Sequence, residues 1–148
     1  MSRIQLGLIV LAALGCAEPT ATSPRPAAPT IVGKQRNNFY SISAADRTVY
    51  VTLAEVRGEG EPLYVFMRRM FASADSAGAR RLVIDLRSIT GSDARALVPL
   101  IKGVVTRDRF AQPGGLVLKV GVNNFGPGQN AATLLQQYAN PILLSDTP

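Results

Sequence analysis

Apolar positions along this chain follow two patterns, short runs typical of strands and longer stripes at helical spacing. The runs are rich in β-branched, aromatic and aliphatic residues, and they predict four strands, at residues 48–53, 81–86, 116–122 and 141–144. The stripes predict three helices between those strands, at about residues 62–77, 93–106 and 127–138. This strand-helix alternation favours an α/β fold with a mainly parallel sheet, right-handed crossovers and helices on its faces.

Residues of special conformation mark where several predicted elements begin and end. Pro62 suits the first turn of the helix that Gly78 then closes. Asp93 is expected to cap the second helix, in which Pro99 lies close enough to the start to cause little disruption. Residues 81–86 are apolar almost throughout, which predicts a strand that is buried on both faces of the sheet.

The chain begins with the layout of a secretory signal. A short charged start precedes an apolar run at residues 4–14, which is too short to span a bilayer. The run ends in Ala13-Leu14-Gly15-Cys16, which resembles the lipobox of bacterial lipoproteins, where the cysteine is lipid-modified. Residues 1–15 are therefore predicted to be a signal peptide, and Cys16 is predicted to anchor an exported lipoprotein to a membrane of the bacterial cell envelope. An ordinary signal peptide that contains a cysteine is the alternative.

Composition changes after Cys16 and again near Phe39. The segment between them is rich in Pro, Ala and Thr at first, a composition that favours extended and solvated chain. Residues 16–38 are accordingly predicted to be a lipidated cysteine with a tether, and residues 39–148 one folded domain.

The balance of charge is basic but dispersed. The chain carries 16 basic and 10 acidic residues, and loss of Arg3 with the signal leaves 15 against 10, a net charge of +5. The doublets Arg68-Arg69 and Arg80-Arg81 are not interleaved with aromatic residues, so solvated surfaces are expected there. Nucleic acid is not an expected partner, whereas the membrane surface is one through the lipid anchor.

The available residue types restrict the chemistry. The sequence has no histidine and one cysteine, which removes Ser-His and Cys-His dyads and the usual zinc sites, and neither a metal nor a cofactor is predicted. The candidate bases are the three lysines, Lys34, Lys102 and Lys119. Candidate nucleophiles, which turns and helix caps explain equally well, are Ser88, Ser92 and Ser145. Asp85 and Asp146 suggest a carboxylate pair, but Asp85 followed by Arg87 is more typical of structural hydrogen bonds at a strand end.

A strand-to-helix turn at residues 123–130 has the layout of a hydrolase site without a nucleophile. Ligands of open α/β sheets bind beyond the carboxyl ends of the strands, so the loop after Asp85, this turn and residues 145–146 are expected to share one rim. Gly126-Pro127-Gly128 begins the third helix, where backbone N–H groups can bind an anion. A tight turn with proline at the first helical position is the alternative, and Pro127 itself offers no N–H.

Six short motifs occur together over roughly residues 39–148 with a specific joint spacing. They are Arg81-Leu-Val-Ile-Asp-Leu-Arg87, the turn at Gly91, the helix through Pro99-Leu100-Ile101, the turn Gln112-Pro113-Gly114, Asn124-Phe125-x-x-x-Gln129-Asn130, and Tyr138-Ala139-Asn140-Pro141-Ile142. Together they resemble the tail-specific (carboxyl-terminal processing) serine peptidase family. The resemblance implies a ClpP/crotonase-like fold, here as a partial core. It also implies a serine nucleophile at the position of Gly126, one oxyanion donor at Pro127 and another in the loop that retains Gly91.

This chain departs from the family's pattern at each of those positions. Glycine stands for serine at 126, proline removes an N–H at 127, and the glycine-rich loop reads Ser88-Ile89-Thr90-Gly91-Ser92. The family's base and much of its substrate groove would lie beyond residue 148, so the domain is expected to be truncated. We therefore expect a catalytically inactive binding or structural module, or a gene remnant.

Two alternatives stay open. A serine-type peptidase acting on unstructured polypeptide C-termini would use a relocated serine with Lys119, or a residue of a partner subunit. A binding module would capture an extended peptide, or another subunit, along an uncovered edge of the last predicted strand.

Overall fold

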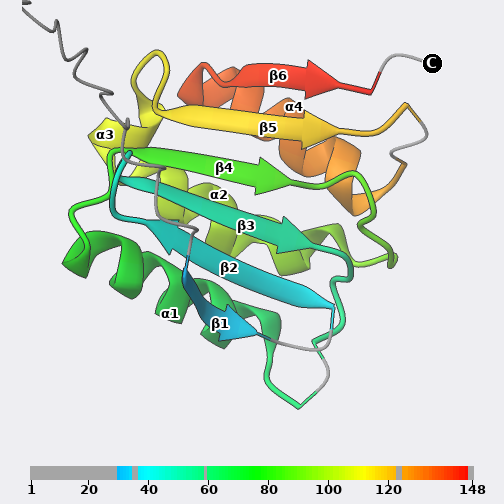
Figure 1. The fold of residues 1–148 in the computed structure, drawn as a ribbon. Coiled ribbons are helices and arrows are strands. Elements are labelled where there is room, and N and C mark those ends of the chain that lie inside the picture. Colours follow the sequence, from blue (N-terminus) through cyan, green and yellow to red (C-terminus); the bar gives the residue numbers. More distant parts are fainter. Residues whose placement is uncertain (1–29, 35–36, 59, 123–124, 147–148) are drawn as a thin grey trace, which may run out of the picture.

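The computed structural model describes residues 30–34, 37–58, 60–122 and 125–146 of the chain. These residues form a six-stranded sheet in which the strands lie side by side in sequence order (Figure 1). The strands are β1 (Thr30–Lys34), β2 (Asn38–Ser43), β3 (Thr48–Leu53), β4 (Arg81–Asp85), β5 (Leu116–Val120) and β6 (Ile142–Ser145). The helices are α1 (Leu63–Ser76), the 3₁₀ turn η1 (Ala94–Leu97), α2 (Val98–Val105), α3 (Asp108–Ala111) and α4 (Pro127–Ala139).

The predicted α/β fold with a mainly parallel sheet is confirmed. Strands and helices alternate from β3 onward, and the pairings β3–β4, β4–β5 and β5–β6 are parallel. The sequence pattern does not predict β1, β2 or α3; β1 and β2 form an antiparallel extension of the sheet beside β3. β1 also falls within the range 16–38 that the composition assigns to a tether.

The predicted signal peptide, Cys16 and the part of the tether before residue 30 lie outside the described residues. Over the described ranges, no helix is both long enough and apolar enough to cross a membrane.

Asp93 caps the second helical segment as predicted, but that segment begins with a 3₁₀ turn. The Asp93 carboxylate accepts a hydrogen bond from the Arg95 N–H at 2.9 Å. Pro99 lies in the first turn of α2 and has no N–H, so it cannot make the α-helical hydrogen bond to the carbonyl of Arg95. The Val98 N–H bonds to that carbonyl instead, with the shorter spacing of a 3₁₀ turn.

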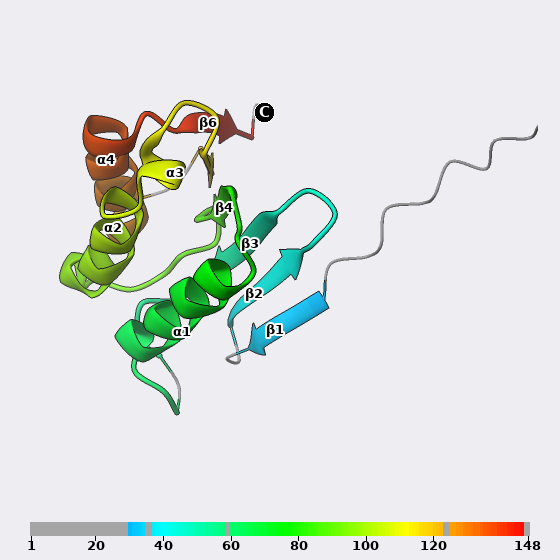
Figure 2. The same ribbon diagram turned by 90° about the vertical axis from the view of Figure 1, so that its left-hand side faces the viewer.

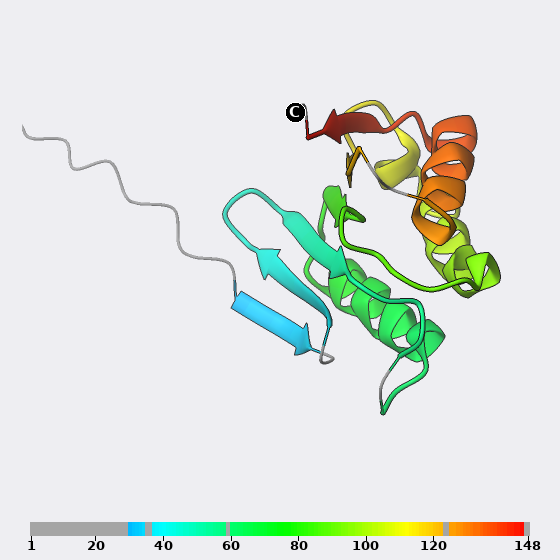
Figure 3. The same ribbon diagram turned by 90° about the vertical axis from the view of Figure 1, so that its right-hand side faces the viewer.

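All helices pack against one face of the sheet, so the prediction of helices on both faces is wrong (Figure 2 and Figure 3). The strand order explains the difference. Each strand from β3 to β6 is added on the same side of the strand before it, and crossovers of a single hand then bring every helix to the same face. In β4, Leu82 and Ile84 are fully buried on the helical face. On the open face Val83 is buried, but Arg81 is exposed and Asp85 only half-buried, so the predicted burial of this strand on both faces holds only at its centre.

The core lies between the sheet and this single helical layer. Tyr40 of β2 is fully buried, and its ring meets the ring of Phe66 in α1 edge-on at 5.6 Å between centroids. The Tyr40 hydroxyl lies 3.0 Å from Oγ of Ser73, which satisfies its polar atom inside the core. These contacts attach β2 to α1. The sequence of β2 by itself carries little strand pattern.

The open face of the sheet carries two rows of side chains, because residues in register on neighbouring strands share a face. One row is mostly apolar and consists of Ser41, Tyr50, Val83, Val117 and Ile142. The other has opposite charges at its centre and consists of Phe39, Thr52, Asp85, Lys119 and Leu144. A second sheet stacked on this face would have to remove Asp85 and Lys119 from water, so these charges oppose such stacking.

Asp75, near the end of α1, binds the segment that contains α3. Its carboxylate accepts hydrogen bonds from Arg107 at 2.7 and 2.9 Å, and it also binds Arg109. The guanidinium of Arg107 lies over the ring of Phe71, 4.6 Å from its centroid. The hydrogen bonds from Arg107, joined by those from Arg109, lower the pKa of Asp75 from 3.8 to about 2 although burial acts the other way.

This ion pair predicts a specific loss of stability in acid. The folded state has the lower pKa, so stabilisation is complete above the unfolded value of 3.8 and is lost as the pH falls toward about 2. Because 42% of the Asp75 side chain is exposed, solvent screening reduces the expected loss to about 1 kcal/mol. Urea unfolding at about pH 5 and pH 2.5 measures it, and Asp75→Asn should remove that component. An unchanged pH dependence in the variant would contradict the assignment.

Candidate functional site

The loops at the carboxyl ends of β4 and β5 meet at one rim of the sheet, as predicted, and the loop after β3, which the prediction did not include, joins them. Backbone hydrogen bonds join the first two loops: the Val56 N–H donates to the Thr90 carbonyl at 3.0 Å, and the Thr90 N–H donates to the Ala54 carbonyl at 2.9 Å. The loop after β5 reaches the same place, because Gly126 lies beside the carbonyl of Gly91. Residues far apart in the sequence therefore surround one point.

Gly91 occupies a position that admits no side chain. Its φ is +122°, where L-residues are rare, and a Cβ there would lie 2.2 Å from Cγ2 of Val56. Val56 is itself buried and cannot easily move aside. The glycine that the family resemblance singles out is thus required by the packing of the rim.

Gly126 is the N-cap of α4, with φ 71° and ψ −129°. Hydrolase nucleophiles occupy a sharp, strained turn of this kind, between a strand and a helix. Among the described residues, a Cβ at Gly126 would meet only the carbonyl oxygen of Gly91, at 3.7 Å, which is an ordinary contact. The turn therefore has room for a side chain but presents none. Asn123 and Asn124, which precede it, lie outside the described residues.

Pro127 occupies the first helical position and is buried, as the tight-turn interpretation predicts. The helical hydrogen bonds begin with the Asn130 N–H, which donates to the Gly126 carbonyl at 3.1 Å. Because proline has no N–H, the first amide donors of α4 belong to Gly128 and Gln129. The donor that the resemblance implies at position 127 is absent.

Asp85 and Asp146 are bridged by a guanidinium. Arg87 donates to Asp85 at 2.7 to 3.2 Å and to Asp146 at 3.2 and 3.3 Å. Burial raises the pKa of Asp85, but the hydrogen bonds from Arg87 outweigh this effect and keep the pKa below its ordinary value. The hydrogen bonds to Asp85, and to a smaller extent those to Asp146, raise the pKa of Arg87. A general acid needs a carboxyl group that keeps its proton near neutral pH, so this cluster is structural, as Asp85 followed by Arg87 indicates.

Among the side chains that the structure describes, the candidate serines do not meet a base. Ser145 pairs with Val120 while Lys119 pairs with Leu144, so Ser145 and Lys119 project from opposite faces of the sheet. Ser88 and Ser92 are exposed in the loop after β4, and within the described ranges neither is hydrogen-bonded to Lys102 or Lys119. No group of three His, Cys, Asp or Glu side chains that could hold a metal gathers among the described residues.

β6 forms one edge of the sheet beside this rim. Within the described part of the chain it pairs with β5 alone, which leaves its outer backbone groups without a strand partner. Its apolar side chains are largely uncovered, since Ile142, Leu143 and Leu144 are 49%, 41% and 48% exposed. Leu143 also lines a pocket of about 280 Å³ between the end of β5 and α4, together with Val122 and Gln129.

A further group of charged residues, which the sequence pattern does not reveal, lies at the opposite end of the strands. Arg80 and Arg81, which the sequence assigns to a solvated surface, line a pocket together with Arg47 and Arg109. The doublet is the only local signal, because the other two arginines come from distant segments.

Comparison of the chain with known protein families, with curated proteins and with solved structures gives no match. The fold and the rim thus define an α/β domain with a mixed, mainly parallel sheet and a strand-to-helix turn built on two facing glycines.

Proposed function

We propose that the chain is an exported, membrane-anchored lipoprotein whose domain resembles the tail-specific peptidases, with a ClpP/crotonase-like partial core, and binds polypeptide without cleaving it. The turn at Gly126 carries the proposal. It has the conformation and position of a nucleophile turn beside Gly91, yet glycine supplies no attacking atom and Pro127 supplies no N–H. Loss of the nucleophile removes the covalent route itself.

The surroundings of the turn support a non-catalytic role. The carboxylates at the ends of β4 and β6, Asp85 and Asp146, are held by Arg87, and Ser145 faces away from Lys119. No arrangement of these groups reproduces a nucleophile that is hydrogen-bonded to a base.

The edge of β6 is the place at which we propose that polypeptide binds. An extended segment can add to such an edge as a further strand, with main-chain hydrogen bonds supplying affinity and pockets for alternate side chains supplying specificity. β6 offers both, through its outer backbone groups and the pocket beside Leu143. The open face is a poorer site, because Asp85 and Lys119 would lose water there. We therefore commit to an extended peptide with apolar side chains at alternate positions.

Unstructured peptides of this kind are expected to bind saturably to the full chain. Leu143→Glu should weaken binding by about tenfold, because it places a carboxylate at the pocket that receives an apolar side chain. Leu134→Glu is the matched control, since Leu134 is 37% exposed on α4 and does not line that pocket. Fluorescence anisotropy of labelled peptides measures both variants.

Four outcomes would count against the proposal. A flat titration would show that the chain does not bind these peptides. Equal losses of affinity in the two leucine variants would show that the pocket beside Leu143 takes no part in binding. Self-association that depends on Leu143, seen by analytical ultracentrifugation without peptide, would make a second copy of the chain the occupant. Labelling of Ser88, Ser92 or Ser145 by a fluorophosphonate probe would favour the peptidase alternative instead.

A further inference from the structure

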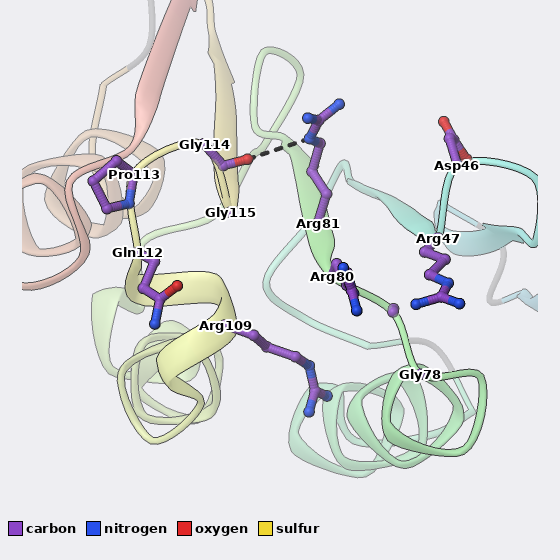
Figure 4. A pocket seen from close by; sticks show the side chains of 11 residues that line it. Asp46, Arg47, Gly78, Arg80, Arg81, Arg109, Gln112, Pro113, Gly114 and Gly115 are labelled. Atoms are coloured by element: carbon purple, nitrogen blue, oxygen red, sulfur yellow. Dashed lines mark hydrogen bonds between the residues drawn. The ribbon is translucent and has the colours of Figure 1, made fainter.

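A pocket lined by four arginines lies at the amino ends of β3, β4 and β5, across the sheet from the rim. Its volume is about 680 Å³, and its charged lining consists of Arg47, Arg80, Arg81, Arg109 and a single acid, Asp46. The arginines come from the β2–β3 turn, the start of β4 and α3, and Figure 4 shows them around a common space.

Backbone contacts fix the positions of these arginines relative to one another. The carbonyl of Arg47 accepts hydrogen bonds from the N–H groups of Arg80 and Arg81, at 2.8 and 3.2 Å. Nε of Arg81 donates to the carbonyl of Gly114 at 3.2 Å, the bond drawn in Figure 4. Arg47 has a φ of 52°, a conformation that favours glycine or asparagine, so the turn holds a long cationic side chain where a small residue fits better.

Among the described residues, carboxylates neutralise only part of this positive charge. Arg109 is shared with Asp75, and Asp46 accepts a hydrogen bond from the Tyr50 hydroxyl at 3.1 Å. Hydrogen bonds from Ser43 and Tyr50 lower the pKa of Asp46, which favours its charged form. Asp46 still supplies only one negative charge among the four arginines of the pocket. Within the described residues, the guanidinium groups of Arg47 and Arg80 form no ion pair.

The chemistry of the lining favours a compact anion. Guanidinium groups bind phosphate oxygens in pairs and retain their charge at any physiological pH. No aromatic ring of the described residues lines the pocket, so none of them would stack on a nucleotide base there. The remaining lining comes from Gln112, Pro113 and small residues.

The pocket also lies at the end of the sheet where the described chain begins. Thr30 pairs with Ile42, near the end of β2, and the residues that follow lead through the β2–β3 turn to Arg47. Thr48 then pairs with Arg81, at the start of β4. The described chain therefore enters the sheet at the same end as the arginines.

We propose that this pocket binds a phosphate-bearing anion, supplied either by a phospholipid headgroup or by a soluble phosphate. The site is independent of the peptide site proposed at β6. It requires neither an enzymatic activity nor the rim.

The test uses the full chain, the double variant Arg47→Ala/Arg80→Ala, and the control Arg57→Ala/Arg68→Ala, which removes two charges from exposed residues outside the pocket. Calorimetric titration with sodium phosphate at constant ionic strength examines the soluble source. Sedimentation with phosphatidylglycerol or phosphatidylcholine vesicles examines the lipid source, and the apolar N-terminal segment contributes equally to all three proteins.

Saturable binding of phosphate, or preferential binding to the anionic vesicles, is expected for the wild type and the control. The affinity of the pocket double variant should fall at least about tenfold in whichever assay is positive, because charge-assisted hydrogen bonds are lost. A response in the phosphate assay identifies a soluble ligand, and a response to vesicles alone identifies a headgroup. Absence of binding in both assays, or equal losses in the two double variants, would overturn the proposal. Thermal unfolding of each variant verifies that it is folded.

Discussion

Replacing Gly91 with alanine should destabilise the domain by about 3 kcal/mol, since backbone strain and overpacking act together at this position. The φ of +122° is unfavourable for any L-residue, and the new methyl group would lie 2.2 Å from Cγ2 of Val56. Urea unfolding followed by circular dichroism measures the loss.

Two further variants separate strain from overpacking. Gly114 has a φ of +80°, and a Cβ added there would have no described atom within 4 Å. Gly114→Ala should therefore lower the free energy of unfolding by only about 1 kcal/mol. Val56→Ala removes the clashing methyl group, so the double variant Val56→Ala/Gly91→Ala should be more stable than the sum of the single changes predicts, by about 1 kcal/mol or more. Strict additivity, or a Gly91→Ala variant as stable as Gly114→Ala, would contradict the contact between the two loops.

Replacing Phe110 with alanine is expected to remove about 3 to 4 kcal/mol of stability. Phe110 is fully buried although it belongs to α3, which is only 4 residues long. The ring centroids of Phe110 and Phe71 are 6.5 Å apart, and the guanidinium of Arg109 lies 4.7 Å from the centroid of the Phe110 ring. Without this side chain, α3 has no other fully buried residue to attach it to the core.

Phe125→Ala is the matched control for this prediction, because Phe125 is 75% exposed. Its effect should stay within about 0.5 kcal/mol, as for most surface changes. Equal stability of the two phenylalanine variants in urea would show that α3 does not depend on Phe110.

The sequence allowed the parallel part of the fold to be predicted but not its antiparallel extension. β3 to β6 carry continuous apolar runs, and α1, α2 and α4 carry clear stripes, so their order could be read directly. The β2–β3 turn contains no glycine, proline or asparagine, and Arg47 takes its left-handed position. A hairpin turn with Asp46 but without glycine, proline or asparagine gives only a weak local signal, and α3 is too short to show a period.

The candidate site was predictable where strand ends determine it. Parallel strands bring their carboxyl ends to one edge, so the loops that contain Gly91 and Gly126 were expected to share one rim, and they do. The arginine pocket was not predictable, because Arg47, Arg80 and Arg109 meet only through the register of β2, β3 and β4 and the packing of α3. Placement of the helices on one face depended on strand order, which apolar patterns do not encode.

The direction of the parallel strands separates the two proposed sites. β4 runs from Arg81, beside the arginines, to Asp85, beside the rim, a span of about 13 Å at the usual rise per residue. A small anion in the arginine pocket therefore cannot touch a side chain in the Leu143 pocket, which lies at the carboxyl end of β5, and the two can be bound at once. A domain resting on an anionic surface by its arginines would turn its rim toward the water, where a long polypeptide can approach without crossing that surface.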